Sequence, residues 1–232
     1  MQEIETWNIA DGILEYIDDI HAYLFNGEIL PSVTQILKIK FGDKYKRVDE
    51  NVLKRASELG TSMHQTIQNY EEFNFDDVTI KELRNYKFLK KHFNWKVLKS
   101  EIPIIIFWNF EEKRFATLEE IENGIGVPVA CGRLDQLIEI ENEKGINDLK
   151  RTSTFDKEYI AYQTNIYRIG VLQTYGIETT FVAGTHLRED VRKFTKLPIN
   201  EEMAISLLNE YLEKEKENGK QNLWSNNIFR WL

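Results

Sequence analysis

The sequence contains very little cysteine. Cys131 is its only thiol, which excludes an internal disulfide, a zinc site with four thiolate ligands and an iron–sulfur cluster held by several thiolates of this chain. Any metal site must therefore use oxygen or imidazole ligands. We expect no iron–sulfur cluster.

Long apolar runs are also absent. No segment approaches the roughly 18 residues of a membrane span, and the opening MQEIETWNIADG does not join a basic head to an apolar stretch, as a secretion signal does. We therefore expect a cytoplasmic protein, in a bacterial host cell, with no membrane partner. Repeats and low-complexity tracts are missing too, and 232 residues that are 42% hydrophobic predict a single domain.

The net charge of −8 argues only weakly against a polyanionic partner, because the distribution of charge matters more than its sum. Positions 81 to 99 hold one acid, Glu82, among many bases: Lys81, Arg84, Lys87, Lys90, Lys91, Lys96 and Lys99. Aromatic residues interleave with them: Tyr86, Phe88, Phe93 and Trp95. Two interpretations stay open, a solvated helix face with its aromatic rings in the core, or a surface that binds nucleic acid.

The order of the predicted elements indicates the α/β class. The Asn26-Gly27 dipeptide between apolar runs predicts a hairpin. The elements expected after it are three helices up to about residue 96, a buried strand at 97–110, a polar insertion at 111–126, a strand hairpin within 131–152, a helix at 153–176, a strand at 178–187 and a helix at about 200–215. We expect one domain, residues 1–232, with an N-terminal hairpin and helical half over 1–96 and an α/β core with a C-terminal helix and tail over 97–232.

The hairpin within CGRLDQLIEIENEKGINDLKRT brings acidic side chains together. Because side chains alternate along a strand, Asp148 and Lys150 point to one side and Leu149 to the other. A turn at ENEKG puts Asp135 at or next to the position facing Asp148, within roughly 5–8 Å. Two such carboxylates repel unless one is protonated or a divalent cation lies between them, and Mg²⁺ or Mn²⁺ suits oxygen ligands.

Lys150 adds a positive charge on the same face. It can stabilise developing negative charge, or help to orient and deprotonate a water, as phosphodiester hydrolysis requires. Spacing alone leaves a second interpretation open, an exposed hairpin face with a weak cross-strand ion pair.

Several short motifs resemble those of the PD-(D/E)XK nuclease superfamily, in its RecB-like and phage exonuclease branch. They are LPSVTQIL at 30–37, GTSMH at 60–64, SEIPI at 100–104, GRLD at 132–135, DLK at 148–150 and QTNIY at 163–167, in the order in which that branch has them. The insertion at 111–126 departs from the pattern. The resemblance implies a restriction-endonuclease-like mixed central sheet flanked by helices, and a catalytic role for the α/β core.

The resemblance also implies residue roles. Asp135 and Asp148 would bind the metal together with the backbone carbonyl of Leu149, and Lys150 would be the catalytic lysine. His64 would be a further ligand, which suits Mn²⁺ better than Mg²⁺, although a lone helix histidine is usually a surface or core residue.

Gln163 and Tyr167 would contribute from the helix after the hairpin. Their i,i+4 spacing lets both hold Lys150 or a scissile phosphate, while core packing is the alternative for Tyr167. Glu101 would contact a metal-bound water, or else merely face solvent. Arg133 and Arg151 flank the acidic pair and are expected to face away from it.

These observations together predict a metal-dependent DNA exonuclease of phage or bacterial recombination or repair. Lys87, Lys90 and Lys91 would hold DNA phosphates, and Trp95 or Phe93 would stack on unpaired bases, so that single-stranded ends are preferred. The alternatives are a structure-specific or restriction-like endonuclease, and a non-catalytic DNA-binding or assembly module. The aromatic tail LWSNNIFRWL, residues 223–232, is a candidate for docking a protein partner.

Overall fold

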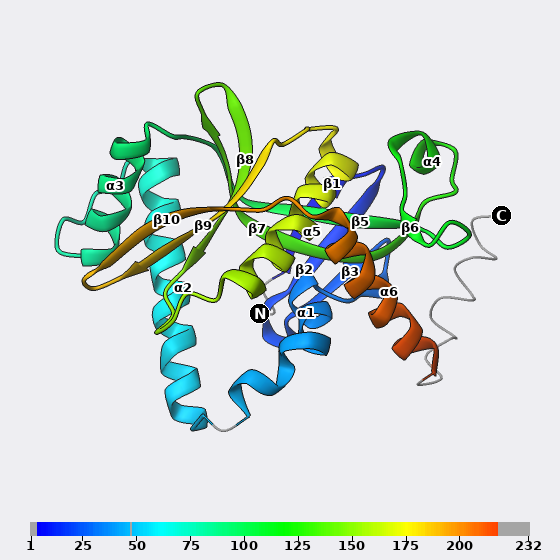
Figure 1. Ribbon diagram of the computed structural model, residues 1–232, viewed down its shortest axis with the longest axis horizontal. Helices are drawn as coiled ribbons and strands as arrows, with labels where there is room; N and C mark the ends of the chain where they lie inside the picture. The colour runs from blue at the N-terminus through cyan, green and yellow to red at the C-terminus, as the bar shows by residue number, and fades with distance from the viewer. Residues whose placement is uncertain (1–3, 47, 218–232) are drawn as a thin grey trace.

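The computed structural model describes residues 4–46 and 48–217 of the chain, which form two β-sheets and the helices that cover them (Figure 1). The helices are α1 Val33–Phe41, α2 Glu50–Phe73, α3 Lys81–Phe93, α4 Leu118–Glu122, α5 Lys157–Tyr175 and α6 Glu201–Glu217, with 3-10 turns at Asp18–Ile20 and Gly42–Tyr45. The predicted tail at 223–232 lies outside the described residues. No helix in the described part is long and apolar enough to cross a membrane.

The central sheet is mixed, as expected, and it has the strand order β10-β9-β8-β7-β5-β6. Its strands are β5 Lys96–Asn109, β6 Arg114–Phe115, β7 Val127–Ile140, β8 Glu143–Lys150, β9 Phe181–Arg188 and β10 Val191–Leu197. Strands β8 and β9 run parallel, with α5 as the crossover between them, and the other pairs are antiparallel. The protein is therefore an α/β protein with helices flanking a mixed sheet.

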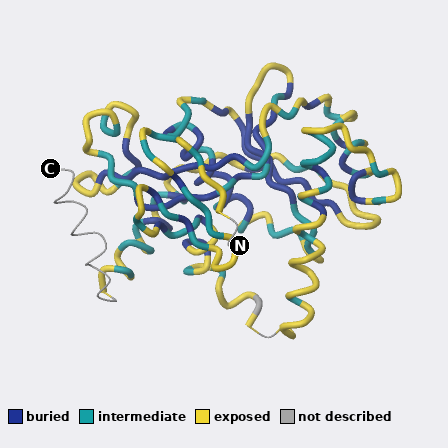
Figure 2. The backbone as a smooth tube through the Cα atoms, turned by 180° about the vertical axis from the view of Figure 1, so that it is seen from behind, coloured by how far each residue is buried: buried dark blue, intermediate teal, exposed yellow. Residues whose placement is uncertain are grey.

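Helices cover the central sheet in two groups. Apolar residues of α1, α5 and α6 pack with Ile104 of β5 and Ile146 of β8, and apolar residues of α2 and α3 pack with Ile138 of β7 and Leu149 of β8. Ile146 and Leu149, three residues apart on β8, thus face opposite layers, as strand alternation requires. The strands are the most deeply buried part of the chain, whereas the first half of α2 is largely exposed (Figure 2).

The hairpin of β7 and β8 has the predicted register. Its turn is Glu141-Asn142, and both residues have positive φ, 53° and 68°, as the tightest hairpin turns require. The ladder runs from Ile140↔Glu143 to Gln136↔Asn147. Asp135 and Asp148 follow that last pair directly, so the prediction that they lie at or next to facing positions is confirmed.

The N-terminal part differs from the expected hairpin and helical half. Asn26-Gly27 does form a hairpin, with Phe25 paired to Glu28, but it belongs to a four-stranded antiparallel sheet. The strands are β1 Ile4–Ile9, β2 Gly12–Ile17, β3 Ala22–Phe25 and β4 Glu28–Leu30. The first turn, Ala10-Asp11, has positive φ at both residues. The Asp11-Gly12 dipeptide is a hairpin signal that the prediction did not use, and it lies one residue after the central pair of the turn.

Three further elements, β6, α4 and β10, were not predicted. The strand β10 carries charged and polar residues, because it lies at the edge of the sheet and exposes much of its length. The polar insertion at 111–126 contains β6 and the short helix α4, which begins with a capping box between Thr117 and Glu120.

Trp95 does not present its ring to solvent, so the prediction that it stacks on DNA bases is wrong. The residue is 2% exposed and packs against Tyr86, Phe93 and Phe194, with ring centroids 5.0 to 6.3 Å apart. Phe93 is half-buried in the same cluster. Phe93 and Trp95, at and just after the end of α3, therefore pack the helix against the sheet.

Replacing Trp95 with alanine is expected to destabilise the fold by about 3–5 kcal/mol, the usual cost of removing a large buried aromatic side chain. Phe88→Ala is the matched control, because Phe88 lies on α3, which ends two residues before Trp95, and is 46% exposed. Denaturant unfolding followed by circular dichroism measures both. Equal, small losses in the two variants would contradict the buried position of Trp95.

Candidate metal and catalytic site

Three acidic residues form a row across three neighbouring strands. Glu101 of β5 lies between the pairs Ser100↔Gln136 and Ile102↔Leu134, which places it opposite Asp135 of β7. Asp148 of β8 is opposite Asp135 on the other side, one step beyond the last ladder pair. Neighbouring strands lie about 4.8 Å apart, so this row concentrates negative charge at one point of the sheet.

Asp148 and Lys150 form a close ion pair on the same face of β8. The Nζ atom of Lys150 lies 2.9 Å from Oδ1 and 2.7 Å from Oδ2 of Asp148. Asp148 is 1% exposed, and apart from this ion pair its buried Oδ2 accepts no hydrogen bond from the described residues. A buried carboxylate oxygen with a single partner retains capacity for a cation.

Asp135 joins the two strands through the backbone. Its Oδ2 accepts a hydrogen bond of 2.6 Å from the backbone N–H of Leu149. The carbonyl of Leu149 faces helix α2, where it accepts a hydrogen bond of 3.0 Å from Nε2 of His64. The backbone N–H and C=O of Leu149, between Asp148 and Lys150, are therefore both held by site residues.

His64 reaches the acidic row from helix α2. Its Nδ1 lies 3.5 Å from Oδ1 of Asp135 and 3.7 Å from Oε1 of Glu101. Burial opposes the charged imidazolium, but the charges of Asp135 and Glu101 outweigh it and raise the pKa of His64 to about 9. A protonated His64 thus partly neutralises the acidic row when no metal is bound.

The residues present fit a divalent cation. Ligand atoms of His64, Glu101 and Asp135 all lie within 4.8 Å of one another, and an imidazole with carboxylate oxygens is a donor set that suits Mn²⁺ and is compatible with Mg²⁺. The Leu149 carbonyl lies 3.0 Å from Nε2 of His64, whereas Asp148 is not part of this group and pairs with Lys150. Glu101 is therefore closer to the ligand set than sequence analysis indicated, and His64 lies beside it as expected.

The charged groups of the site change one another's pKa values. Burial raises the pKa of Asp148 and of Asp135 above the usual range, against the opposing effects of Lys150 and His64. Burial alone would lower the pKa of Lys150, but Asp148 and Asp135 raise it above its ordinary value. Lys150 therefore stays protonated and is suited to stabilise negative charge, which favours that role over removing a proton from water.

Glu101 has an unusual backbone conformation. Its φ is 47°, in the left-handed region that residues other than glycine seldom adopt, within a strand that is otherwise extended. A register shift between Val97 and Lys99 lies just before it. Conformations of this kind cost about 1–3 kcal/mol and tend to occur where a side chain must be aimed at a functional site.

The expectation that Arg133 faces away from the acids is wrong. Residues 133 and 135 are two apart on β7 and therefore share a face. Nε of Arg133 lies 3.2 Å from Oε2 of Glu101, and its Nη1 donates to Glu5 at 2.9 Å. Arg151 instead pairs with Glu82 of α3, Nε to Oε1 at 2.7 Å. Alternation, applied correctly, would have identified Arg133 as a site residue.

Gln163 and Tyr167 lie together on α5 and are both buried. Nε2 of Gln163 donates to the hydroxyl of Tyr167 at 3.4 Å, and Oε1 of Gln163 is buried without a hydrogen-bond partner in the described residues. Neither contacts Lys150 through a hydrogen bond. The ring that Lys150 does approach is Tyr159, 5.9 Å from Nζ to the centroid, one turn earlier on the same helix face, and that i,i+4 spacing could have indicated it.

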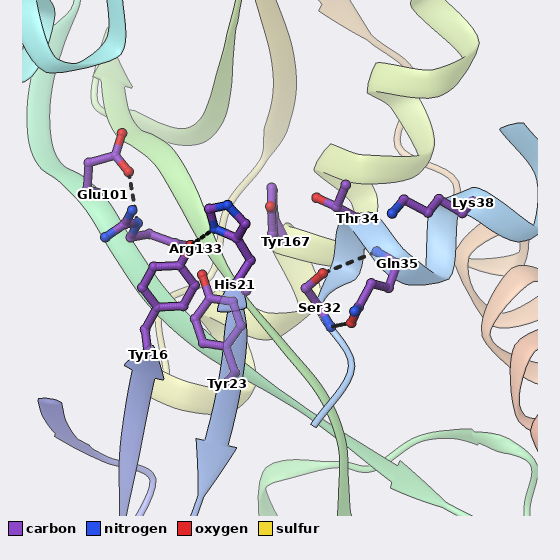
Figure 3. Close-up of a pocket in the computed structure, with 11 residues that line it drawn as sticks. Tyr16, His21, Tyr23, Ser32, Thr34, Gln35, Lys38, Glu101, Arg133 and Tyr167 are labelled. Atoms are coloured by element: carbon purple, nitrogen blue, oxygen red, sulfur yellow. Dashed lines mark hydrogen bonds and ion pairs between the residues drawn. The ribbon is translucent and has the colours of Figure 1, made fainter. Parts of the chain in front are cut away.

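Two cavities meet at the Glu101–Arg133 ion pair. One, of about 360 Å³, lies between the N-terminal sheet and the start of α1, and Figure 3 shows Tyr16, His21 and Tyr23 on one side of it with Thr34 and Lys38 on the other. The second, of about 730 Å³, is lined on its α2 side by Gly60, Thr61 and His64. Of the acidic row, Glu101 lines both cavities, whereas Asp135 and Asp148 line neither.

The lysines predicted to hold DNA differ in their surroundings. Lys87 pairs with Asp76, and Nζ of Lys90 lies 2.6 Å from Oε2 of the largely buried Glu71. Both have a partner already, so they are poor phosphate ligands. Lys91 is exposed and makes no ion pair with the described residues.

No family model matches the sequence, and no curated protein matches it significantly. Among solved structures, the crystal structure of SSO0001 is similar, with a TM-score of 0.42 and 15% identity over 79% of this chain and 75% of that chain. A similarity at this level supports no particular family or activity.

Raising the pH is expected to destabilise the protein in the presence of a chelator, because His64 then loses its proton beside two carboxylates. The pKa in the folded state, about 9, lies above the ordinary 6.5, so the stabilisation is complete below pH 6.5 and is lost as the pH rises through 9. The loss should be about 1–3 kcal/mol. Thermal unfolding of the natural protein and of His64→Gln measures it, and the same pH dependence in both would contradict the assignment.

Proposed function

We propose that this protein is a metal-dependent deoxyribonuclease with a restriction-endonuclease-like fold, related to the RecB-like branch of the PD-(D/E)XK superfamily. The observation that carries the proposal is the acidic row of Glu101, Asp135 and Asp148, with Lys150 and His64 beside it. Burying several negative charges together costs free energy unless a cation compensates for them. The short motifs in family order, which contain these same residues, also support the proposal.

A divalent ion in this site would polarise a phosphoryl oxygen and lower the pKa of a bound water. Asp135, Asp148, Glu101, His64 and the Leu149 carbonyl would hold it. The contribution of the chain itself is positional and electrostatic. The Lys150 ammonium is kept protonated by its acidic neighbours and can stabilise the negative charge that develops on a phosphate during hydrolysis.

Gln163 would supply a second polar group, after Lys150, for positioning the phosphate. Its buried Oε1 has no hydrogen-bond partner among the described residues, and its Nε2 donates to the Tyr167 hydroxyl at 3.4 Å. The face of α5 that carries both residues also carries Tyr159, next to Lys150. We infer that this helix face fixes the position of Lys150 and of the phosphate that it contacts.

Exonuclease action is the mode that we propose, in phage or bacterial recombination or repair. Purified protein is expected to digest end-labelled linear single-stranded DNA in Mg²⁺ or Mn²⁺ and to leave it intact in a chelator. Covalently closed circular single-stranded DNA of the same sequence should resist digestion. Equal digestion of the circle would replace exonuclease with endonuclease action, and cleavage that persists in the chelator would refute the metal-dependent mechanism.

A further inference from the structure

Helix α3 has two chemically different faces. Leu83, Tyr86 and Leu89 are buried against the sheet and α2. The opposite face is exposed along its whole length and carries what we call the outer stripe: Lys81, Arg84, Phe88 and Lys91. The spacings of three, four and three residues align these side chains on one side of a helix.

The ion pairs of α3 separate its cations into two sets. Lys87 and Lys90, on the side toward α2, are neutralised by Asp76 and Glu71. Lys81, Arg84 and Lys91 of the outer stripe make no ion pair with any described residue. The chain as a whole has a net charge of −8, so a row of unpaired cations is a local exception that points to an anionic partner.

Flat side chains lie beside these cations. Phe88 is 46% exposed. The guanidinium carbon of Arg192, from β10, lies 3.7 Å from the centroid of the Phe88 ring, and the His92 ring is parallel to it at 5.9 Å and 7°. The three groups form a stack of planar groups at the centre of the stripe, which we call the platform.

The platform is held in place by the turn between β9 and β10. Nδ2 of Asn85 donates to the backbone carbonyls of Arg188 and Glu189, each at 3.1 Å. A cleft of about 440 Å³ lies between the helix and this turn. Its lining includes two acids, Glu189 and Asp190, beside Lys81, Arg84 and Arg192, so cations predominate there.

We propose that the outer stripe and the platform bind single-stranded DNA, with phosphates on Lys81, Arg84 and Lys91 and a base stacked on the platform. The identity of this ligand rests on the proposed function. Cations with interleaved flat rings are the usual composition of a single-strand surface, since bases stack on rings and guanidinium planes. From Lys81 to Lys91 the helix rises about 15 Å, which is long enough to contact more than one phosphate of a strand.

Fluorescence anisotropy with a labelled oligothymidylate in chelator tests this binding without cleavage. The double variant Arg84→Ala/Lys91→Ala is expected to weaken binding about tenfold or more at low salt, and to reduce the slope of log K against log salt by about 1.4, or about 0.7 per phosphate contact. Phe88→Ala should weaken single-strand binding at least about fivefold and leave a blunt duplex unaffected.

The matched control is Lys87→Ala/Lys96→Ala. It removes the same charge from the same basic segment, but both lysines have acidic partners, Asp76 and Glu139. We expect its affinity to stay within about twofold of the natural protein. Equal weakening by the control and the stripe variant would overturn the proposal, and so would unchanged binding by the stripe variant. Circular dichroism confirms that each variant is folded.

The outcome is separable from that of the proposed function. If the natural protein binds oligothymidylate through the stripe but cuts no DNA in Mg²⁺ or Mn²⁺, the nuclease assignment falls and the binding surface stands. If it cuts DNA and the stripe variants bind and cut normally, the proposed binding surface is rejected and the nuclease assignment is kept. An effect of Phe88→Ala on a duplex as large as on the single strand would overturn the stacking part.

Discussion

Replacing Asp148 with asparagine is expected to lower the rate of DNA hydrolysis in Mg²⁺ or Mn²⁺ by at least about a thousandfold. Asparagine keeps the size of the side chain but removes one negative charge from the acidic row, and with it a ligand for the cation. Several kcal/mol of transition-state stabilisation depend on such a charge, and each 1.36 kcal/mol corresponds to about a factor of ten in rate.

The measurement is single-turnover cleavage of end-labelled DNA, with metal binding followed separately by calorimetry. Glu139→Gln is the matched control, because Glu139 is a carboxylate of β7 that pairs with Lys96, Nζ to Oε1 at 3.6 Å, outside the site. The control should cleave like the natural protein. Folded Asp148→Asn that still cleaves at the natural rate would remove Asp148 from the site.

The acidic pair could be predicted because strand geometry is regular. A short turn fixes the register of a hairpin, and alternation then fixes which side chains share a face. Asp135, Asp148 and Lys150 follow from these two rules alone. The same rules place Arg133 beside Asp135, and the wrong expectation for that residue was an error in applying alternation.

Glu101 is harder to place from sequence, because its position depends on contacts between distant segments. The strand that carries it pairs with β7 across a register shift, and its φ of 47° redirects the side chain. A polar insertion also separates the two strands in the sequence. Nothing local in SEIPI indicates either feature, so the third member of the acidic row became evident only with the sheet complete.

The basic segment shows a different limit. Composition indicates that residues 81 to 99 are rich in cations and rings, but it does not say which of them have partners. Asp76 and Glu71 lie outside the segment and neutralise Lys87 and Lys90, while Trp95 faces the core. Helical periodicity separates the buried face from the outer stripe, whereas the ion pairs depend on how α3 packs against α2.

Replacing Lys150 with alanine is expected to lower the rate of cleavage by about 10²–10⁴, the usual contribution of a positioned catalytic group. Binding of DNA should change far less, because one phosphate contact is a small part of the total affinity. The reason lies in the position of Lys150: its ammonium is held 2.7 Å from Oδ2 of Asp148, within the acidic row, so it acts on the reacting phosphate and not on the rest of the strand.

Removing Lys150 also leaves Asp148 buried without its partner, so the variant could lose stability or metal affinity. Lys150→Arg keeps the charge but changes its geometry, and it separates these effects: it should retain the fold and DNA binding and still lose most of the rate.

Lys144→Ala, an exposed lysine of the same strand, is the control and should cleave normally. Binding and single-turnover cleavage are measured on the same DNA at saturating metal. A parallel, modest fall in both quantities would reduce Lys150 to an ordinary phosphate contact, because a group that acts in the chemical step must affect the rate more than the affinity.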